Sequence, residues 1–299
     1  MKILITGYSG FVGKNVKNYF SNKFYFYDFD IRNQMQSIPP DVDIIMHFAG
    51  KAHDSKSIAN ASDYYFANTE LTKNIYDKFL TSNASVFITL SSVKAVADSL
   101  NEELTEDVLP NPKTHYGKSK LFAEKYISSK IPASDKRVYI LRPCMLHGPG
   151  NKGNLNILNK MIIKNIPWPL GAYENKRSFC SIQNLCFILN ELIFNITIPN
   201  GIYNVADDIP LSTNDLVKLF SITKRTNTLI LKLPKSLIKF IVTIGDFIKL
   251  PFNSESLEKL TENYIVNNNK IKNAMGKQLP VDSTQGLIIT LKSFLKNAK

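Results

Sequence analysis

The sequence predicts an α/β protein whose first half forms a doubly wound parallel sheet. Strand-like and helix-like segments alternate between residues 2 and 141. Residues 43–48 (Asp-Ile-Ile-Met-His-Phe) are almost continuously apolar, which is typical of a strand covered on both faces. A glycine-rich turn over residues 7–13 joins the first strand directly to a helix. Strands alternating with helices favour a parallel sheet, because the connections between parallel strands are usually helical.

The individual elements follow from hydrophobic periodicity. We expect strands at 2–6, 24–27, 42–48, 85–90 and 138–141, and helices at 14–22, 63–81 and 114–129. The pattern loosens after about Pro149, where short strand-like pieces such as 201–205 lie between helices, and a last helix is expected at 284–295. Residues 1–150 are therefore expected to form the sheet domain, with part of the later chain returning to it. Residues 151–299 are expected to form mainly a smaller lobe.

Composition narrows the class of protein. The 299 residues are 44% hydrophobic and 21% charged, as in ordinary globular proteins. No apolar run approaches the ~20 residues that span a bilayer, and the short apolar N-terminus reads as a buried strand, so we expect a cytoplasmic protein. Three cysteines without a CxxC pair predict neither disulfides nor a metal site. The net charge of +12 is spread along the chain, which favours an anionic small substrate over nucleic acid.

Residues 235–250 (KSLIKFIVTIGDFIKL) are apolar with lysines at intervals. Such a helix could lie on a membrane surface. Gly245 and Asp246 are expected to interrupt it, however, and packing within the small lobe is the simpler interpretation. Membrane contact is therefore not expected.

The turn Thr6-Gly7-Tyr8-Ser9-Gly10-Phe11-Val12-Gly13 predicts a dinucleotide site on a Rossmann-type sheet. Gly7 permits a tight turn, Gly10 lets the backbone approach a pyrophosphate, and Gly13 permits close packing of helix and strand. The N–H groups of the following helix attract phosphate. Asp28 lies at the spacing from Gly7 that ribose recognition needs, which favours NAD over NADP. Arg32 could meet a 2′-phosphate, so NADP stays open.

Tyr116 and Lys120 are four residues apart and therefore share one face of the predicted helix. A neighbouring ammonium and a nicotinamide ring favour phenolate, so we expect the pKa of Tyr116 to fall toward the working range. Ser92, at the end of the preceding strand, would hydrogen-bond the substrate oxygen that Tyr116 protonates or deprotonates. The order of glycine turn, Ser-Ser strand end and YxxxK indicates hydride-transfer chemistry.

Along its length the chain resembles extended short-chain dehydrogenases/reductases of the NAD-dependent epimerase/dehydratase family. Besides the glycine turn, Asn68, Ser91-Ser92 and the Tyr116/Lys120 pair, the runs that carry the resemblance are Phe48-Ala49-Gly50, Leu141-Arg142-Pro143, His147-Gly148-Pro149-Gly150, Arg177-Ser178-Phe179, Tyr203-Asn204-Val205 and Asn269-Lys270-Ile271-Lys272. The resemblance implies that the cofactor is bound by Gly7, Ser9, Gly10, Phe11, Val12, Gly13, Asp28, Phe48, Ala49, Gly50, Lys51, Asn68, Leu90 and Ser91, that Pro143 abuts the nicotinamide, and that Asp30 and Ile31 reach the adenine. It also implies a homodimer.

Val93 and Lys94 narrow the reaction, because 4,6-dehydratases of this family carry an Asp-Glu pair at that place. Dehydration is therefore not expected. The runs Ser91-Ser92-Val93-Lys94, Tyr116-Gly117-Lys118-Ser119-Lys120, Pro169-Leu170-Gly171 and Asn175-Lys176-Arg177-Ser178 resemble a subgroup of bacterial polysaccharide and O-antigen enzymes acting on UDP-linked N-acetyl sugars. We favour reduction of a UDP-linked 4-keto-6-deoxy sugar over 4-epimerization of UDP-glucose or UDP-GlcNAc. A non-catalytic NAD(H)-binding regulatory protein is the remote alternative.

The substrate residues are expected mainly in the second lobe. Arg177 can grip a diphosphate in a bidentate manner. By the resemblance, Asn154 lies where the family holds the diphosphate. Trp168 and Leu170 would form a wall for uracil, and His53 would face the sugar; core packing or a structural role is the competing interpretation for these three.

Overall fold

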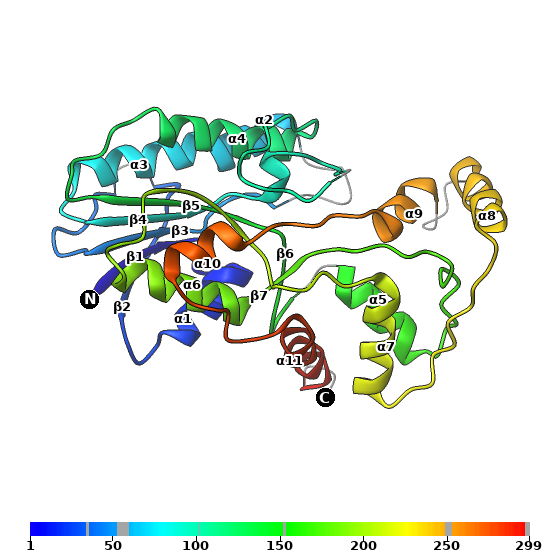
Figure 1. The fold of residues 1–299 in the computed structure, drawn as a ribbon. Helices are drawn as coiled ribbons and strands as arrows, with labels where there is room; N and C mark the ends of the chain where they lie inside the picture. Colours follow the sequence, from blue (N-terminus) through cyan, green and yellow to red (C-terminus); the bar gives the residue numbers. More distant parts are fainter. Residues whose placement is uncertain (34–35, 53–59, 101, 152–153, 249–252, 297–299) are drawn as a thin grey trace.

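The computed structural model describes residues 1–33, 36–52, 60–100, 102–151, 154–248 and 253–296; the side chains of 154, 156, 157, 295 and 296 are not described. A six-stranded parallel sheet in the order β2-β1-β3-β4-β5-β8 forms its centre (Figure 1). Its strands are β1 (Lys2–Thr6), β2 (Tyr25–Phe29), β3 (Ile44–His47), β4 (Val86–Leu90), β5 (Arg137–Pro143) and β8 (Gly201–Val205). The predicted doubly wound parallel sheet is confirmed.

Helices cover both faces of the sheet (Figure 1). One face carries α2 (Ala61–Tyr65), α3 (Leu71–Thr81) and α4 (His115–Ser128), and the other carries α1 (Phe11–Tyr19), α6 (Ile182–Phe194) and α10 (Asn269–Met275). Ile75 of α3 and Phe87 of β4 belong to the core on the first side. Val16 of α1 and Leu185 of α6 belong to the core on the second. Burial on both faces explains why the strands read as continuous apolar runs.

Several boundaries differ from the sequence prediction by one to three residues, and three of these differences affect the region of the site. α1 begins at Phe11, inside the glycine-rich turn, so the helix starts three residues earlier than its apolar pattern indicates. β2 continues to Phe29, which places Asp28 inside the strand. The helix expected at 63–81 begins at Ala61 and contains a π-helical segment, Phe66–Glu70, between α2 and α3. Such π-turns frequently occur at functional sites.

The smaller lobe contains a two-stranded parallel ladder and five helices of the described chain. These elements are β6 (Met145–His147), β7 (Phe179–Ser181), α5 (Asn154–Ile163), α7 (Thr213–Lys224), α8 (Lys235–Phe247), α9 (Ser254–Thr261) and α11 (Ser283–Lys296). Apolar side chains of these elements, such as Phe220 and Leu287, form a separate core together with Trp168 from the connection between α5 and β7. The chain returns to the main sheet through α6, β8 and α10.

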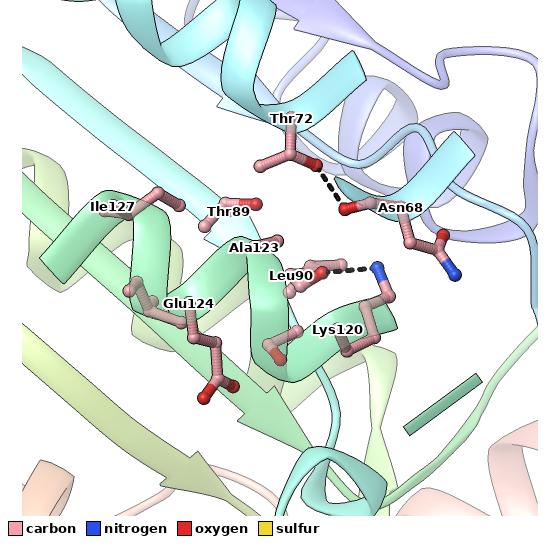
Figure 2. Close-up of a pocket in the computed structure, with 10 residues that line it drawn as sticks. Asn68, Thr72, Thr89, Leu90, Lys120, Ala123, Glu124 and Ile127 are labelled. Atoms are coloured by element: carbon pink, nitrogen blue, oxygen red, sulfur yellow. Dashed lines mark hydrogen bonds between the residues drawn. The ribbon is translucent and has the colours of Figure 1, made fainter. Parts of the chain in front are cut away.

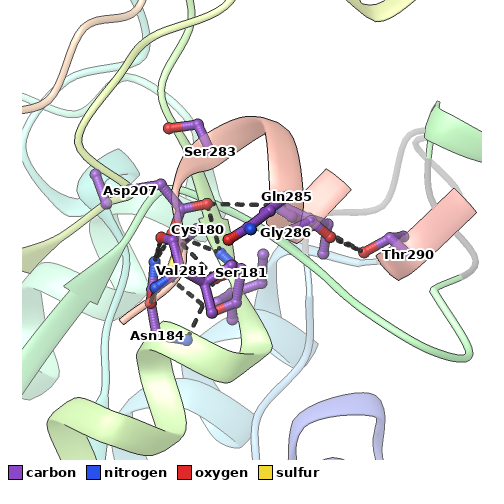
Figure 3. A network of polar contacts seen from close by, with 12 residues as sticks. Cys180, Ser181, Asn184, Asp207, Val281, Ser283, Gln285, Gly286 and Thr290 are labelled. Atoms are coloured by element: carbon purple, nitrogen blue, oxygen red, sulfur yellow. Dashed lines mark hydrogen bonds and ion pairs between the residues drawn. The ribbon is translucent and has the colours of Figure 1, made fainter. Parts of the chain in front are cut away.

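A buried polar network joins this lobe to the sheet domain (Figure 3). The carboxylate of Asp207 accepts hydrogen bonds from the backbone N–H of Ser181 at 3.0 Å and from Nδ2 of Asn184 at 2.7 Å. The imidazole of His147 is bonded through Nδ1 to Oγ1 of Thr290 in α11 at 2.9 Å. Because each group is buried and paired, the network holds α11 in one position against the ladder. Among the described residues, no helix is both long and apolar enough to cross a bilayer.

Candidate active site

Ser92, Tyr116 and Lys120 come together at the carboxyl end of β4. Tyr116 and Lys120 are on the first turns of α4, whose N-cap Thr114 accepts a hydrogen bond from the backbone N–H of Gly117 at 3.2 Å. Ser92 begins the 3-10 turn Val93–Ala95 and hydrogen-bonds the side chain of Tyr116. The structure thus brings together three side chains that the sequence selected from two separate segments.

The pKa of Tyr116 differs from the sequence expectation. Burial raises it above its ordinary value, and the hydrogen bond from Ser92 opposes this only in part. The expected lowering is therefore not produced by the protein's own groups. The ammonium of Lys120 donates to the carbonyl of Leu90 at 2.9 Å, which anchors it at the carboxyl end of β4 (Figure 2). A bound nicotinamide would have to supply the remaining stabilisation of phenolate.

Lys120 is held in a confined, electrostatically defined position. Burial lowers its pKa to about 8, and the carboxylate of Glu124, one helical turn further, raises it in opposition. A Cβ on Gly50 would lie 3.2 Å from the Lys120 Nζ, so the glycine leaves the ammonium its space. Glu124 is itself anchored by a buried bidentate ion pair with Arg142, at 2.9 and 2.6 Å.

A small cavity of about 10 Å³ lies beneath Lys120 (Figure 2). The side chain of Ser91, which lines it, is buried and its hydroxyl has no hydrogen-bond partner among the described residues. The other lining residues are Asn68, Thr72, Thr89, Leu90, Lys120, Ala123, Glu124, Ile127 and Ile140. Pro143 ends β5, beside the carboxyl end of β4. Leu90, Ser91 and Pro143 therefore lie near Ser92 and Lys120, and their contact with a cofactor stays a prediction.

The glycine turn leaves little space for side chains and leads into a helix without a side-chain cap. Gly7 has φ +70°, and a Cβ there would lie 2.6 Å from the backbone N of Ala49. A Cβ on Gly13 would collide with the carbonyl oxygen of Gly7. α1 begins after Gly10 with no side-chain cap and no acidic residue in its first turn, so its N–H groups are open to an anion. Phe11 and Val12 pack partly against the core, while Ser9 is exposed beside the turn.

The two acids after the second strand occupy different environments. Asp28 is paired in register with Ile5, and its carboxylate binds the ammonium of Lys17 at 2.6 Å. Asp30 follows the strand, and because Phe29 is opposite Thr6, it lies level with Gly7. Asp30 is exposed and Ile31 is buried. By position, Asp30 is better placed than Asp28 to meet a ribose held over the turn.

The loop after β3, comprising Phe48, Ala49, Gly50 and Lys51, is fastened by Asn68 of the π-helix. Asn68 Oδ1 accepts from the Lys51 backbone N–H at 2.8 Å, and its Nδ2 donates to the Lys51 carbonyl at 3.1 Å. The same Nδ2 reaches the hydroxyl of Ser119 in α4 at 3.0 Å. One buried amide therefore ties the expected cofactor loop to α4, the helix that carries Tyr116 and Lys120.

Sequence reasoning missed His47, which lies under this loop. Its Nδ1 is 2.7 Å from Oγ1 of Thr6 and its Nε2 is 2.8 Å from Oγ1 of Thr72. Thr6 accepts from the backbone N–H of Ala49, and Thr72 donates to the carbonyl of Asn68. These bonds form a buried chain from the glycine turn to the π-helix. The sequence signal for His47 was a histidine within an otherwise apolar strand. The buried pair of Glu124 and Arg142 was also missed, and its signal was that each is a charged residue within a segment that is expected to be buried.

The expected substrate residues are less closely gathered. Arg177 is largely buried, where it pairs with Glu262 at 3.3 Å and donates to the carbonyl of Lys259. Trp168 is 3% exposed, with its indole N–H bonded to Asn214, and Leu170 is 1% exposed. Both belong to the lobe's core, which was the competing interpretation for them. Asn154 begins α5, but its side chain is not described, and His53 lies outside the described residues.

Residues 3–206 match the NAD-dependent epimerase/dehydratase family. The chain belongs to this family. The predicted resemblance is confirmed, and the expected nicotinamide cofactor agrees with the family's dependence on NAD. Two features of this chain fit such a cofactor: α1 has no side-chain cap, and Gly7 and Gly13 stand where a Cβ would collide with neighbouring backbone.

Named relatives cover most of the chain. It is 28% identical to a UDP-glucose 4-epimerase of Vibrio cholerae, over 98% of this chain and 95% of that protein. It is also 28% identical to the N-acetyl-α-D-glucosaminyl-diphospho-ditrans,octacis-undecaprenol 4-epimerase of Escherichia coli O157:H7, over 72% of this chain and 70% of the relative. Among solved structures, a UDP-glucuronic acid 4-epimerase from Bacillus cereus with NAD superposes with a TM-score of 0.75 at 17% identity, covering 100% of both chains. That likeness establishes the shared fold.

Proposed function

We propose that this protein transfers hydride between NAD and C4 of a hexose carried on a diphosphate, with UDP-sugars as the first substrates to test. The observation that carries the proposal is the juxtaposition of Tyr116, Ser92 and Lys120 at the carboxyl edge of the parallel sheet, the edge from which the open N-terminus of α1 also follows β1. The relatives named above act on sugars linked through diphosphate, as their names state. Family membership and site chemistry thus support the same class of substrate.

Each residue has a defined task in this mechanism. Bound nicotinamide supplies or accepts the hydride. Tyr116 exchanges a proton with O4 of the sugar, and Ser92 hydrogen-bonds that oxygen and holds it toward the phenol. Lys120, whose pKa of about 8 keeps it mostly protonated at neutral pH, favours the phenolate and binds the ribose of the cofactor. Asp30 accepts from the adenosine ribose, which favours NAD over NADP; a lower KM for NADPH than for NADH would contradict this.

Two reactions use this chemistry. 4-Epimerization oxidises C4 and returns the hydride to the other face of the sugar. 4-Keto reduction delivers hydride once, and the Ser91–Lys94 run resembles reductases of polysaccharide synthesis. The relative that spans 98% of this chain is named as a 4-epimerase, so epimerization is supported equally. The sequence preference for the reductase therefore stays a prediction.

Dehydration is not part of the proposal. Val93 is buried, and the ammonium of Lys94 lies 4.3 Å from the centroid of the Tyr264 ring. Neither side chain carries the carboxylate that would remove water from the sugar.

The deciding experiment incubates the protein with UDP-glucose and UDP-GlcNAc without added cofactor. Inversion at C4 identifies an epimerase. Consumption of NADH only with a 4-keto-6-deoxy sugar identifies a reductase, and a 4-keto-6-deoxy product from UDP-glucose would identify a dehydratase.

Tyr116→Phe should abolish turnover and leave NAD affinity within about twofold. Tyr126→Phe, on the exposed side of the same helix, is the matched control and should stay active.

Arg177 is proposed to release Glu262 and bind the substrate diphosphate. Arg177→Ala should then raise the KM for the sugar nucleotide at least tenfold, because a charge-assisted pair is lost. An unchanged KM would remove Arg177 from the binding site.

A homodimer is also proposed. Phe66, in the π-helical segment, and Phe122, in α4, are about half exposed, and the ring centroids of Tyr65 and Phe122 are 5.8 Å apart. Sedimentation velocity, with Phe122→Glu as the disrupting variant, tests this face.

A further inference from the structure

α8 presents an exposed apolar face at the far end of the small lobe, away from the sheet (Figure 1). The helix runs without a break from Lys235 to Phe247. The expectation that Gly245 and Asp246 interrupt it is therefore wrong. Its buried residues are Ile238, Val242 and Gly245. The large apolar residues that remain exposed on or directly after the helix are Leu237 (44%), Phe240 (65%), Ile241 (41%), Ile244 (45%), Phe247 (89%) and Ile248 (56%).

These exposed side chains form one continuous stripe, here called the α8 stripe. Residues 237, 241, 244 and 248 are spaced by four, three and four positions, which aligns them along one side of a helix. Phe240 and Phe247 are seven positions apart and extend the stripe on the side away from the buried residues. The stripe therefore runs the length of the helix, and a flat surface could contact all of it at once. A patch of this kind marks an interaction site.

The chemistry of the stripe distinguishes a lipid surface from a protein partner. It consists of Leu, Ile and Phe and lacks the Trp, Tyr and Arg that dominate protein–protein hot spots. Lys235 and Lys239 are exposed on the polar side of the helix, and Lys232 is exposed just before it. Lysine is depleted in protein interfaces, whereas it is favoured beside anionic headgroups.

The charge on this helix is complementary to an anionic surface. The one acidic residue of the helix is Asp246. Its carboxylate accepts hydrogen bonds from the backbone N–H and the hydroxyl of Ser254, at 2.9 and 2.5 Å. The whole chain carries +12. Lysines above an apolar stripe are the arrangement with which helices lie in the interface of an anionic bilayer.

We propose that α8 docks the small lobe on the surface of a bilayer that contains anionic lipid. The α8 stripe enters the boundary between headgroups and acyl chains, and the lysines remain among the headgroups. The docking does not depend on the catalytic proposal, because α8 contributes no residue to the site around Tyr116. Turnover of a water-soluble nucleotide sugar should be the same with and without vesicles.

The test is co-sedimentation of the full-length protein with vesicles of phosphatidylcholine and phosphatidylglycerol. The double variant Phe240→Glu/Phe247→Glu should bind on the order of a hundredfold more weakly, because it loses the favourable transfer of two phenylalanine side chains from water into the bilayer. The matched control is Leu109→Glu/Ile131→Glu, which alters residues 88% and 97% exposed elsewhere on the surface. It should bind like the wild type. Pure phosphatidylcholine vesicles should bind roughly tenfold less.

Unchanged thermal unfolding and NAD affinity in both double variants establish that the fold is intact. Failure of the wild-type protein to bind anionic vesicles would overturn the proposal. Equal loss in the control variant would also overturn it, since nonspecific charge would then explain the binding. A dimer that dissociates in Phe240→Glu/Phe247→Glu, without vesicle binding by the wild type, would assign the α8 stripe to a second copy of the chain.

Discussion

Replacing His47 by Gln should make the folded protein less sensitive to acid. The imidazole is 1% exposed and lies between Thr6 and Thr72. Burial lowers its pKa to about 3, and the positive charge of Lys120 adds to the effect. The folded state therefore keeps His47 neutral at pH values where the unfolded chain takes up a proton.

The size of the effect follows from the two pKa values. A histidine in the unfolded chain has a pKa of ~6.5. Above that pH neither state binds the proton, and the stability that depends on the neutral ring is fully present. As the pH falls from 6.5 toward the folded value of about 3, the unfolded state gains a proton that the folded state refuses. At ~pH 5 the loss amounts to about 2 kcal/mol.

The assay is urea unfolding of the wild type and of His47→Gln at pH 7 and pH 5. At pH 7 the variant should be about 1–2 kcal/mol less stable, because one amide cannot replace both hydrogen bonds. At pH 5 the gap should close or reverse, since Gln does not titrate. Thr72→Val is the matched control: it removes a partner of the ring but keeps the ring, and its acid sensitivity should equal that of the wild type. The reasoning would be refuted if the free energy of unfolding fell by the same amount from pH 7 to pH 5 in the wild type and in His47→Gln.

Further predictions concern Lys120 and the glycine turn. Glu124→Gln should destabilise the fold by about 3 kcal/mol, because the guanidinium it pairs with stays charged and buried. It should also lower the pKa of Lys120 further below about 8, moving the alkaline limb of the kcat/KM profile to lower pH; an unmoved limb would contradict this. Gly13→Ala should cost about 2 kcal/mol in urea unfolding, because its Cβ meets rigid backbone. Gly10→Ala, whose Cβ would lie 3.1 Å from the Gly7 carbonyl oxygen, should spare stability and weaken NAD binding roughly tenfold by titration; equal effects of the two substitutions on both measurements would contradict the separate roles.

Much of the sheet domain could be predicted because its signals are local. Apolar runs identified the strands, and the turn at Gly7 and the four-residue spacing of Tyr116 and Lys120 each lie within one short segment. Boundaries were harder, since α1 begins at Phe11 inside the glycine motif.

The remaining features depend on contacts between distant segments. The pKa of Tyr116 was expected to fall, yet it rises, because burial is a property of the packed site. Trp168 looked like a wall for a base but packs into the core of the small lobe. The hydrogen bonds of His47 and the ion pair of Glu124 with Arg142 could not be predicted, because the partners in each case come from different strands and helices.

By itself, the sequence determined the class of fold, the glycine turn after the first strand and the pairing of Tyr116 with Lys120 on one helix, because periodicity and short spacings specify local geometry. The tertiary structure alone decided the protonation tendencies of Tyr116 and Lys120, because desolvation depends on what packs around a group. It also decided which part of α8 faces solvent. Amphipathic spacing predicts that a helix has an apolar face, but only its place at the end of the lobe leaves most of that face uncovered.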